Sequence, residues 1–173
     1  MAGAGLVALA LWLAANDVAR RTVRVQGLTR FMALALLTGY AWLATAGVLW
    51  VGHASVLAGP GRDAMLHALF LGFVMSMIFA HAPVIVPGVL GVAMSWRPIS
   101  YTHLVLLHAG LLVRVVADLV GAAAVVRWGG LLNVAAVLLF LANTGVGVRA
   151  SLGGPAVPRA DAPQADAAGA AHV

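Results

Sequence analysis

The sequence contains no cysteine, no lysine and no glutamate. Without cysteine the chain cannot form a disulfide, a thiolate metal site or a cysteine nucleophile. Its formal charge comes from ten arginines and five aspartates, which together are 9% of the residues. In a soluble domain about a quarter of the residues are charged. The shortage of charge therefore argues against a soluble globular domain.

Apolar residues fill most of the chain. They make up 63% of it, and the mean hydropathy is +1.03. Several uncharged runs reach the roughly 20 residues that a helix needs to cross a hydrocarbon core of about 30 Å. These runs do not alternate apolar with polar residues, as the strands of a membrane barrel do. The sequence therefore predicts an all-α protein, a polytopic transmembrane helical bundle.

The uncharged runs predict about five spans. They are expected at residues 2–15, 31–52, 64–83, 100–120 and 128–148. The first is short for a span and has no positive segment before it, so it is a poor signal peptide. We interpret it as a membrane helix clipped at its N-terminus. After residue 149 the composition shifts to Ala, Pro, Gly and Asp, which predicts a disordered tail over 150–173.

The arginines predict the orientation of the chain. Residues 16–30 form a short loop with four arginines, and short basic loops stay in the cytoplasm. Only Arg62 and Arg127 then lie outside. Seven arginines lie inside: Arg20, Arg21, Arg24, Arg30, Arg97, Arg149 and Arg159. We expect a multi-pass protein of the bacterial inner membrane with a cytoplasmic tail. Because these arginines flank spans, the net charge of +5 does not indicate a nucleic-acid partner.

The longest uncharged stretch lies between Asp63 and Arg97 and contains His67 and His81. On a continuous α-helix these imidazoles are about 40° apart around the axis and about 21 Å apart along it. They would share one face near opposite sides of the membrane. A titratable side chain inside a span is costly and is by default a candidate for function. Pro83 and the second proline, Pro87, predict either a kink or the end of the helix.

Five histidines fall at or within spans, at two depths. His53 and His67 belong to the outer side, and His81, His103 and His108 to the inner side. Neutral imidazole is a ligand for haem iron, copper and zinc. We therefore expect haem or a transition metal such as copper at His67 and His81, and less so at His53. His103 and His108 are candidates from a second helix. The alternative is that these histidines are hydrogen-bonded packing residues.

Arg114 and Asp118 lie four residues apart within the fourth span. At this spacing they are expected to form a structural ion pair. Arg114 also falls on the helix face of His103, about 20° away. From there its guanidinium could instead bind a haem propionate or another anion. Both readings remain open at this point.

Three apolar motifs resemble the C-terminal half of NnrS-type proteins. They are GYAWLATAGVLW at 39–50, HALFLGFVMSMI at 67–78 and LLHAGLLVRVVADL at 106–119. NnrS proteins are bacterial polytopic membrane proteins described as containing haem and copper and linked to nitric oxide stress. The resemblance implies cofactor binding through His67, with Arg114 as the second matched residue. His81, with the prolines after it, and the smaller number of spans depart from that pattern, which indicates a fragment or a shorter relative.

Three functions follow from these patterns. The first is an NnrS-like membrane protein that binds haem or a transition metal, linked to nitric oxide or respiratory metabolism. The second is a small transporter or channel-like subunit whose histidines and Arg–Asp pair line a polar path. The third is a structural membrane subunit. In each case the lipid bilayer is the main partner, and a second copy or other membrane subunits would complete the bundle.

Overall fold

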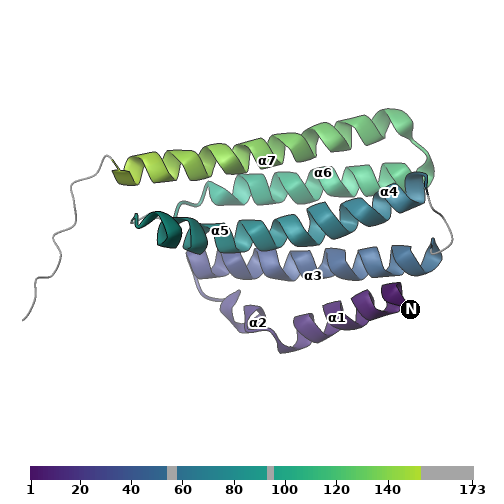
Figure 1. The fold of residues 1–173 in the computed structure, drawn as a ribbon, viewed down its shortest axis with the longest axis horizontal. Helices are drawn as coiled ribbons and strands as arrows, with labels where there is room; N and C mark the ends of the chain where they lie inside the picture. Colours follow the sequence, from purple (N-terminus) through teal and green to yellow (C-terminus); the bar gives the residue numbers. More distant parts are fainter. Residues whose placement is uncertain (54–57, 93–95, 153–173) are drawn as a thin grey trace, which may run out of the picture.

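The computed structural model describes residues 1–53, 58–92 and 96–152. Of these residues 87% are helical, and none of the three ranges contains a strand. The long helices lie side by side, and neighbours along the chain run in opposite directions (Figure 1). The predicted all-α helical bundle is confirmed.

Seven helices and one π-helix make up the described chain. In order they are α1 (Ala2–Asn16), α2 (Ala19–Thr22), α3 (Leu28–Gly52), α4 (Pro60–His67), η1 (Ala68–Val74), α5 (Met75–Leu90), α6 (Ser100–Val120) and α7 (Ala123–Leu152). The segments α4, η1 and α5 follow one another without a break and form a single long helix. The π-helix η1 is the middle part of that helix.

Four helices in the described part of the chain are long and apolar enough to cross a membrane. They are Leu28–Gly52, Pro60–Leu90, Ser100–Val120 and Ala123–Leu152. α1 is apolar but has 15 residues, about 22 Å of helix, which is less than the hydrocarbon thickness of about 30 Å. By the length and composition of its helices the chain is a membrane protein, and these four helices contain the ranges 31–52, 64–83, 100–120 and 128–148 that were predicted as spans.

The third predicted span, 64–83, is too short at both ends. The helix begins at Pro60, and it continues through Pro83 and Pro87 to Leu90. A proline at the first turn replaces an N–H that would have no partner in the helix, so Pro60 suits a helix start. Inside a membrane helix a proline is tolerated where neighbouring helices, hydroxyl side chains or local changes of the helix satisfy the backbone carbonyl that it frees.

The last helix also exceeds its prediction. The expected span was 128–148, whereas α7 covers Ala123–Leu152. The predicted tail, 150–173, therefore begins too early, because Ser151 and Leu152 are still helical. The rest of that predicted tail, 153–173, lies outside the described residues.

Glycines allow the closest helix contacts. A Cβ added to Gly3 of α1 would lie 2.7 Å from the carbonyl oxygen of Gly47 in α3, and one added to Gly47 would lie 2.7 Å from the carbonyl oxygen of Gly3. At the other side of the bundle, a Cβ on Gly129 of α7 would lie 2.7 Å from the backbone nitrogen of Arg114. Small residues at such crossings let two backbones approach closely, as is common in membrane bundles.

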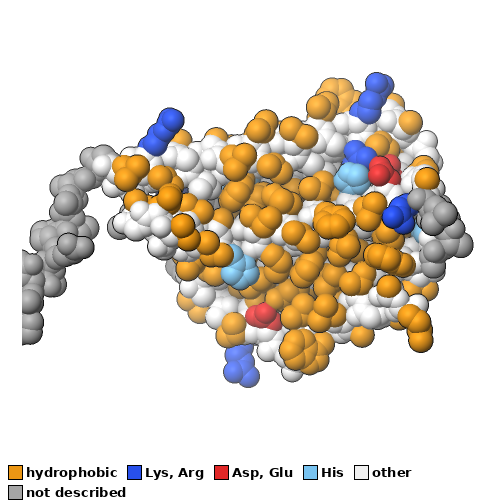
Figure 2. Space-filling model, viewed as in Figure 1, with side chains coloured by type: hydrophobic (Ala, Val, Ile, Leu, Met, Phe, Trp, Pro, Cys, Tyr) orange, Lys and Arg blue, Asp and Glu red, His pale blue; other side chains and the backbone are white. Residues whose placement is uncertain are grey.

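The core is built from aromatic and aliphatic side chains between α3, α5, α6 and α7. Phe31, Phe79 and Leu107 are fully buried there, and Phe140 stacks on Phe79 with ring centroids 4.5 Å apart. Large apolar side chains also cover the outer surface of the bundle (Figure 2). An exposed apolar surface of this kind suits contact with lipid tails.

The π-helix interrupts the α-helical periodicity between the two principal histidines. The predicted common face assumed an unbroken α-helix, whereas a π-helical turn holds about one more residue, which is about 100° of rotation. His67 lines a pocket together with Arg114, while the side chain of His81 is exposed. The two histidines therefore do not share one environment.

Candidate functional site

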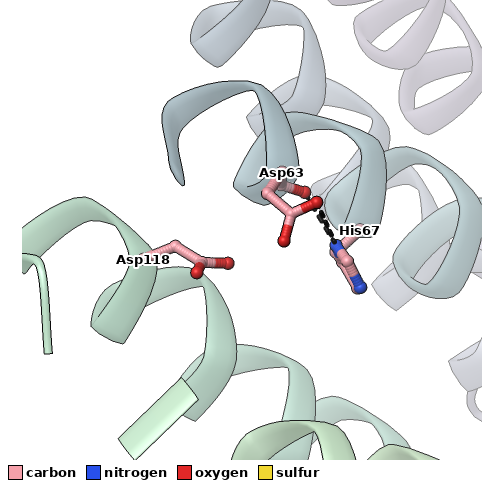
Figure 3. Close-up of side chains that lie close together, drawn as sticks. All are labelled: Asp63, His67 and Asp118. Carbon is pink, nitrogen blue, oxygen red and sulfur yellow. Dashed lines mark hydrogen bonds and ion pairs between the residues drawn. The ribbon is translucent and has the colours of Figure 1, made fainter. Parts of the chain in front are cut away.

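Four charged or titratable side chains meet where the start of α4 lies beside the end of α6. Asp63 and His67 come from α4, one turn apart, and Arg114 and Asp118 come from α6, one turn apart. Residues four apart lie on one helix face, so the antiparallel packing of α4 on α6 brings the two pairs together. We call these four residues the ionic cluster. Figure 3 shows the carboxylates of Asp63 and Asp118 facing one another, with His67 beside Asp63.

Arg114 is bound by both carboxylates of the ionic cluster. Its Nη2 donates a hydrogen bond to Asp63 Oδ2 at 2.8 Å, and its Nε lies 3.7 Å from Asp118 Oδ2. The predicted ion pair between Arg114 and Asp118 is therefore present, but the shorter contact joins Arg114 to Asp63. Asp63 was not among the site residues predicted from the sequence. Its position could have indicated a role in the site: Asp63 lies one turn before His67, at the start of the long helix that runs antiparallel to α6.

His67 has one ring nitrogen fixed by the backbone. Its Nδ1 lies 2.8 Å from the carbonyl oxygen of Asp63 and 4.0 Å from Asp63 Oδ1. Because a carbonyl oxygen only accepts, Nδ1 carries the proton and Nε2 of the neutral ring is an acceptor. In Figure 3 Nδ1 faces Asp63, and the other ring nitrogen points away from both carboxylates.

Asp118 is the most deeply buried member of the ionic cluster. Its side chain is 6% exposed, whereas that of Asp63 is 48% exposed. Among the described residues, Asp118 Oδ2 and Arg114 Nε have no hydrogen-bond partner. Buried polar atoms are nearly always hydrogen-bonded.

The ionic cluster includes a set of metal-ligating atoms. Ligand atoms of Asp63, His67 and Asp118 all lie within 4.8 Å of one another. Two carboxylate oxygens and one imidazole nitrogen are donors that zinc, manganese and iron accept. Of the described histidines and aspartates, these three are the ones grouped closely enough to hold a metal ion.

A pocket of about 400 Å³ adjoins the ionic cluster. His67 and Arg114 line one part of it, and α7 supplies Gly130, Asn133 and an apolar wall. Asn133 is 3% exposed, and neither Oδ1 nor Nδ2 of its amide has a hydrogen-bond partner among the described residues. The amide lies against α6, because a Cβ added to Gly110 would lie 2.7 Å from Asn133 Oδ1. The pocket is therefore mostly apolar, with the polar side chains of His67 and Arg114 in its lining.

His108 is a packing residue within α6. Trp42 Nε1 donates to His108 Nδ1 at 3.0 Å, and Thr38 Oγ1 lies 2.9 Å from His108 Nε2. Since an indole only donates, Nδ1 is the acceptor and Nε2 carries the proton. Both ring nitrogens are therefore used, which leaves none for a metal.

His103 lies in an aromatic box and not beside His67. Its ring makes edge contacts with Phe31, Phe79 and Phe140, and its Nδ1 lies 3.3 Å from Asn143 Nδ2. His103 is 3% exposed. The predicted pairing of His67 or His81 with a histidine of the second helix does not occur within the metal-ligating group described above.

His53 and His81 lie apart from the ionic cluster. The Nδ1 of His81 lies 2.7 Å from the carbonyl oxygen of Met77, and that of His53 lies 3.0 Å from the carbonyl oxygen of Leu49. Each ring is thus held by the turn before it, in the same way as His67. Of the predicted site residues, the structure brings together His67, Arg114 and Asp118.

These helices and the ionic cluster define the class of protein: an all-α membrane protein with a charged site at one end of its helical bundle. The chain belongs to the DUF8744 family, a domain of unknown function, whose family model matches residues 1–148. No curated protein and no solved structure matches the chain.

Proposed function

We propose that this membrane protein binds a divalent transition-metal ion through Asp63, His67 and Asp118. The observation that carries the proposal is the close grouping of these three ligands, within 4.8 Å, around a buried Asp118 oxygen that accepts no hydrogen bond from the described residues. The donor set of one nitrogen and two oxygens suits zinc, manganese or iron. The nitrogen would be His67 Nδ1, which lies on the side of the carboxylates (Figure 3) and would give up its proton and its hydrogen bond to the Asp63 carbonyl when the metal binds. Copper would be taken as Cu(II), because Cu(I) selects sulfur ligands.

Arg114 would hold the site together before the metal enters. It neutralises part of the carboxylate charge, at 2.8 Å from Asp63 and 3.7 Å from Asp118. A divalent ion carries twice the charge and approaches a carboxylate oxygen to about 2.0–2.2 Å, so it competes effectively with a guanidinium. Gly130 leaves Arg114 Nη1 without a side chain in front of it, which gives the guanidinium room to move towards the pocket.

Haem is a second cofactor that the proposal includes, with His67 as its ligand. The resemblance to NnrS proteins supports a haem or copper cofactor linked to nitric oxide or respiratory metabolism. His67 is the one imidazole of the ionic cluster, while both nitrogens of His108 are used and His103 lies in the aromatic box. A haem would therefore be held by His67 from this part of the chain, and a second histidine would have to come from a second copy or another membrane subunit.

Buried leucines lie between the polar groups of α6, which favours a binding function over transport. Leu107 and Leu111 of α6 are fully buried, and they lie in sequence between His103 and Arg114. The polar side chains of His103, of His108 and of the ionic cluster thus form separate groups. A polar path across the bundle would need them to be continuous.

The proposed location is the bacterial inner membrane. The arginine-rich loop with α2 and the C-terminal end of α7 lie at one end of the bundle, and α4 starts at the other (Figure 1). The positive-inside rule assigns the arginine-rich end to the cytoplasm. The ionic cluster would then face the outer side of that membrane.

The test is a metal titration of the protein purified in mild detergent and stripped with a chelator. After dialysis against zinc, manganese, iron or copper, elemental analysis should find about one ion per chain. His67→Ala and Asp118→Asn should each weaken binding by about tenfold or more, because each removes a ligand. An absorption spectrum of the untreated protein, oxidised and then reduced, detects haem in the same samples.

His81→Ala is the matched control, because it removes an exposed histidine of the same long helix without touching the ionic cluster. It should bind metal as the unaltered protein does. Equal metal content in the unaltered protein and in the His67→Ala and Asp118→Asn variants would contradict the proposal. The ionic cluster would then be a structural device that joins α4 to α6.

A further inference from the structure

A polar hollow lies at the arginine-rich end of the bundle, where α1 ends and α2 begins. Its volume is about 550 Å³, and its lining includes Asn16, Asp17, Val18, Arg20, Arg21 and Arg24. We call it the arginine hollow. In Figure 1 α2 lies towards the opposite end of the bundle from the start of α4. The arginine hollow therefore lies apart from the ionic cluster and shares no residue with it.

Hydrogen bonds fix the shape of the arginine hollow. Asp17 Oδ1 accepts the backbone N–H of Ala19 at 2.7 Å, and Asp17 Oδ2 accepts the hydroxyl of Tyr40 in α3. Arg20 Nη1 donates to the carbonyl oxygen of Ala15 at 3.0 Å, which ties α2 back to the end of α1. The connection between α1 and α2 is therefore held on both sides, and its concave shape belongs to the fold.

The arginines of the hollow present positive charge and free N–H donors. A guanidinium stays protonated and has five such donors. The side chains of Arg21 and Arg24 are exposed, and they make no hydrogen bond or ion pair with any residue that the structure describes. Asp17 is the one carboxylate of the lining. Even with Asp17 ionised, the three guanidiniums leave an excess of positive charge, so the ligand that fits the arginine hollow is an anion.

Apolar side chains lie beside these donors. Val18, in the lining, is 64% exposed, and Trp12 of α1 is 61% exposed. Trp12 lies one turn before Asn16, whose Nδ2 donates to the Trp12 carbonyl oxygen at 2.9 Å. Tryptophan side chains are enriched where lipid tails meet head groups. An anion in the arginine hollow therefore lies next to a surface for lipid tails, which fits the phosphate of a lipid better than a free ion.

We propose that the arginine hollow binds the head-group phosphate of an anionic phospholipid through Arg21 and Arg24. The fork of a guanidinium matches two oxygens of a phosphate, and basic pockets at the membrane surface bind anionic head groups. Phosphatidylcholine carries a quaternary ammonium, which the guanidiniums repel. The arginine hollow therefore selects a head group such as that of phosphatidylglycerol, whose acyl chains lie along the apolar surface of α1.

The test measures the lipid that the full chain retains from mixed micelles of a mild detergent with phosphatidylglycerol and phosphatidylcholine in equal amounts. After gel filtration the retained lipid is extracted and measured over a range of lipid-to-detergent ratios. We expect saturable retention of about one phosphatidylglycerol per chain and a clear excess of it over phosphatidylcholine. An arginine at the membrane surface changes the affinity about fivefold. Arg21→Gln combined with Arg24→Gln should therefore lower the affinity for phosphatidylglycerol by about tenfold or more.

A second double variant makes the comparison independent of net charge. Arg30 lies in the first turn of α3 and Arg149 in the last turn of α7, at the same end of the bundle as α2 (Figure 1). Both are exposed, and neither lines the arginine hollow. Arg30→Gln combined with Arg149→Gln removes the same charge and should retain phosphatidylglycerol as the unaltered protein does.

Inorganic phosphate distinguishes a lipid site from a site for the free ion. Added to the mixed micelles at millimolar concentration and constant ionic strength, it should leave the retention of phosphatidylglycerol unchanged. Three results would overturn the proposal. The first is equal retention of the two lipids by the unaltered protein, and the second is equal retention of phosphatidylglycerol by the two double variants. The third is displacement of phosphatidylglycerol by inorganic phosphate, which would make the arginine hollow a site for the free ion.

Discussion

Arg114 is the residue that joins the ionic cluster to the rest of the bundle. Its guanidinium contacts Asp63 of α4 and Asp118 of α6, and its backbone packs against Gly129 of α7. The side chain is 18% exposed and that of Asp118 is 6% exposed. Removing one partner of a buried ion pair is far more damaging than removing both, because the remaining charge stays buried and unpaired.

We therefore expect Arg114→Leu to lower the free energy of unfolding in detergent by about 3–5 kcal/mol. The added substitution Asp118→Leu should restore much of that loss, because it removes the stranded carboxylate. The control is Arg127→Leu, which removes an exposed arginine of α7 and should change stability little. Equal losses for Arg114→Leu and Arg127→Leu would show that the ionic cluster does not support the fold.

The histidines show that residue type alone does not determine whether a side chain binds a ligand or packs inside the bundle. Sequence analysis predicted His67, His81, His103 and His108 from their depth in the membrane, and their chemistry at that stage was identical. In the structure His108 is held by Trp42 and Thr38, a contact between side chains 66 or more residues apart in sequence. No local pattern around His108 contains that information.

At the scale of single elements, the π-helix and the helix crossings decide which groups meet. The π-helix η1 follows His67 directly and separates α4, which carries Asp63 and His67, from α5. Sequence analysis treated the whole stretch as α-helix. π-Helical turns are often found at functional sites, and this one adjoins both the ionic cluster and the pocket.

The crossing of α1 on α3 depends on the absence of side chains at Gly3 and Gly47. A Cβ at Gly3 would lie 2.7 Å from the Gly47 carbonyl oxygen, while a Cβ at Gly5 would meet nothing within 4 Å. We expect Gly3→Val to reduce the free energy of unfolding by about 1–3 kcal/mol through overpacking. Gly5→Val, measured by the same unfolding titration, should behave as the unaltered protein does. A similar loss in both variants would mean that helix propensity, and not the crossing, is responsible.

The whole molecule has two unlike ends. One end holds the arginine-rich loop and the C-terminal end of α7, and the other holds the start of α4 and the turn between α6 and α7 (Figure 1). α7 has 30 residues, about 45 Å of helix, so it exceeds a hydrocarbon core of about 30 Å and must tilt or extend beyond it. The side of the membrane that each end faces determines from where a metal would reach the ionic cluster.

The natural absence of cysteine allows that orientation to be tested with single cysteines. Gln26, between α2 and α3, and Ala58, just before α4, are both exposed. The α2–α3 connection and the start of α4 lie at opposite ends of the bundle (Figure 1). In intact cells a membrane-impermeant maleimide should label Ala58→Cys and should label Gln26→Cys only after the cells are lysed. Labelling of Gln26→Cys alone in intact cells would reverse the orientation and place the ionic cluster on the cytoplasmic side.

The sequence by itself determined the class of protein and the approximate places of its long helices, because long uncharged runs leave the backbone no stable alternative to a helix in a membrane. It also predicted the Arg114–Asp118 pair, which depends only on residues one turn apart. The tertiary structure decided the rest. Asp63 meets Arg114, Asn133 meets the pocket and His108 meets Trp42 only because separate helices pack at particular rotations. Those rotations depend on small-residue contacts and on one π-helix, which hydropathy and spacing do not report.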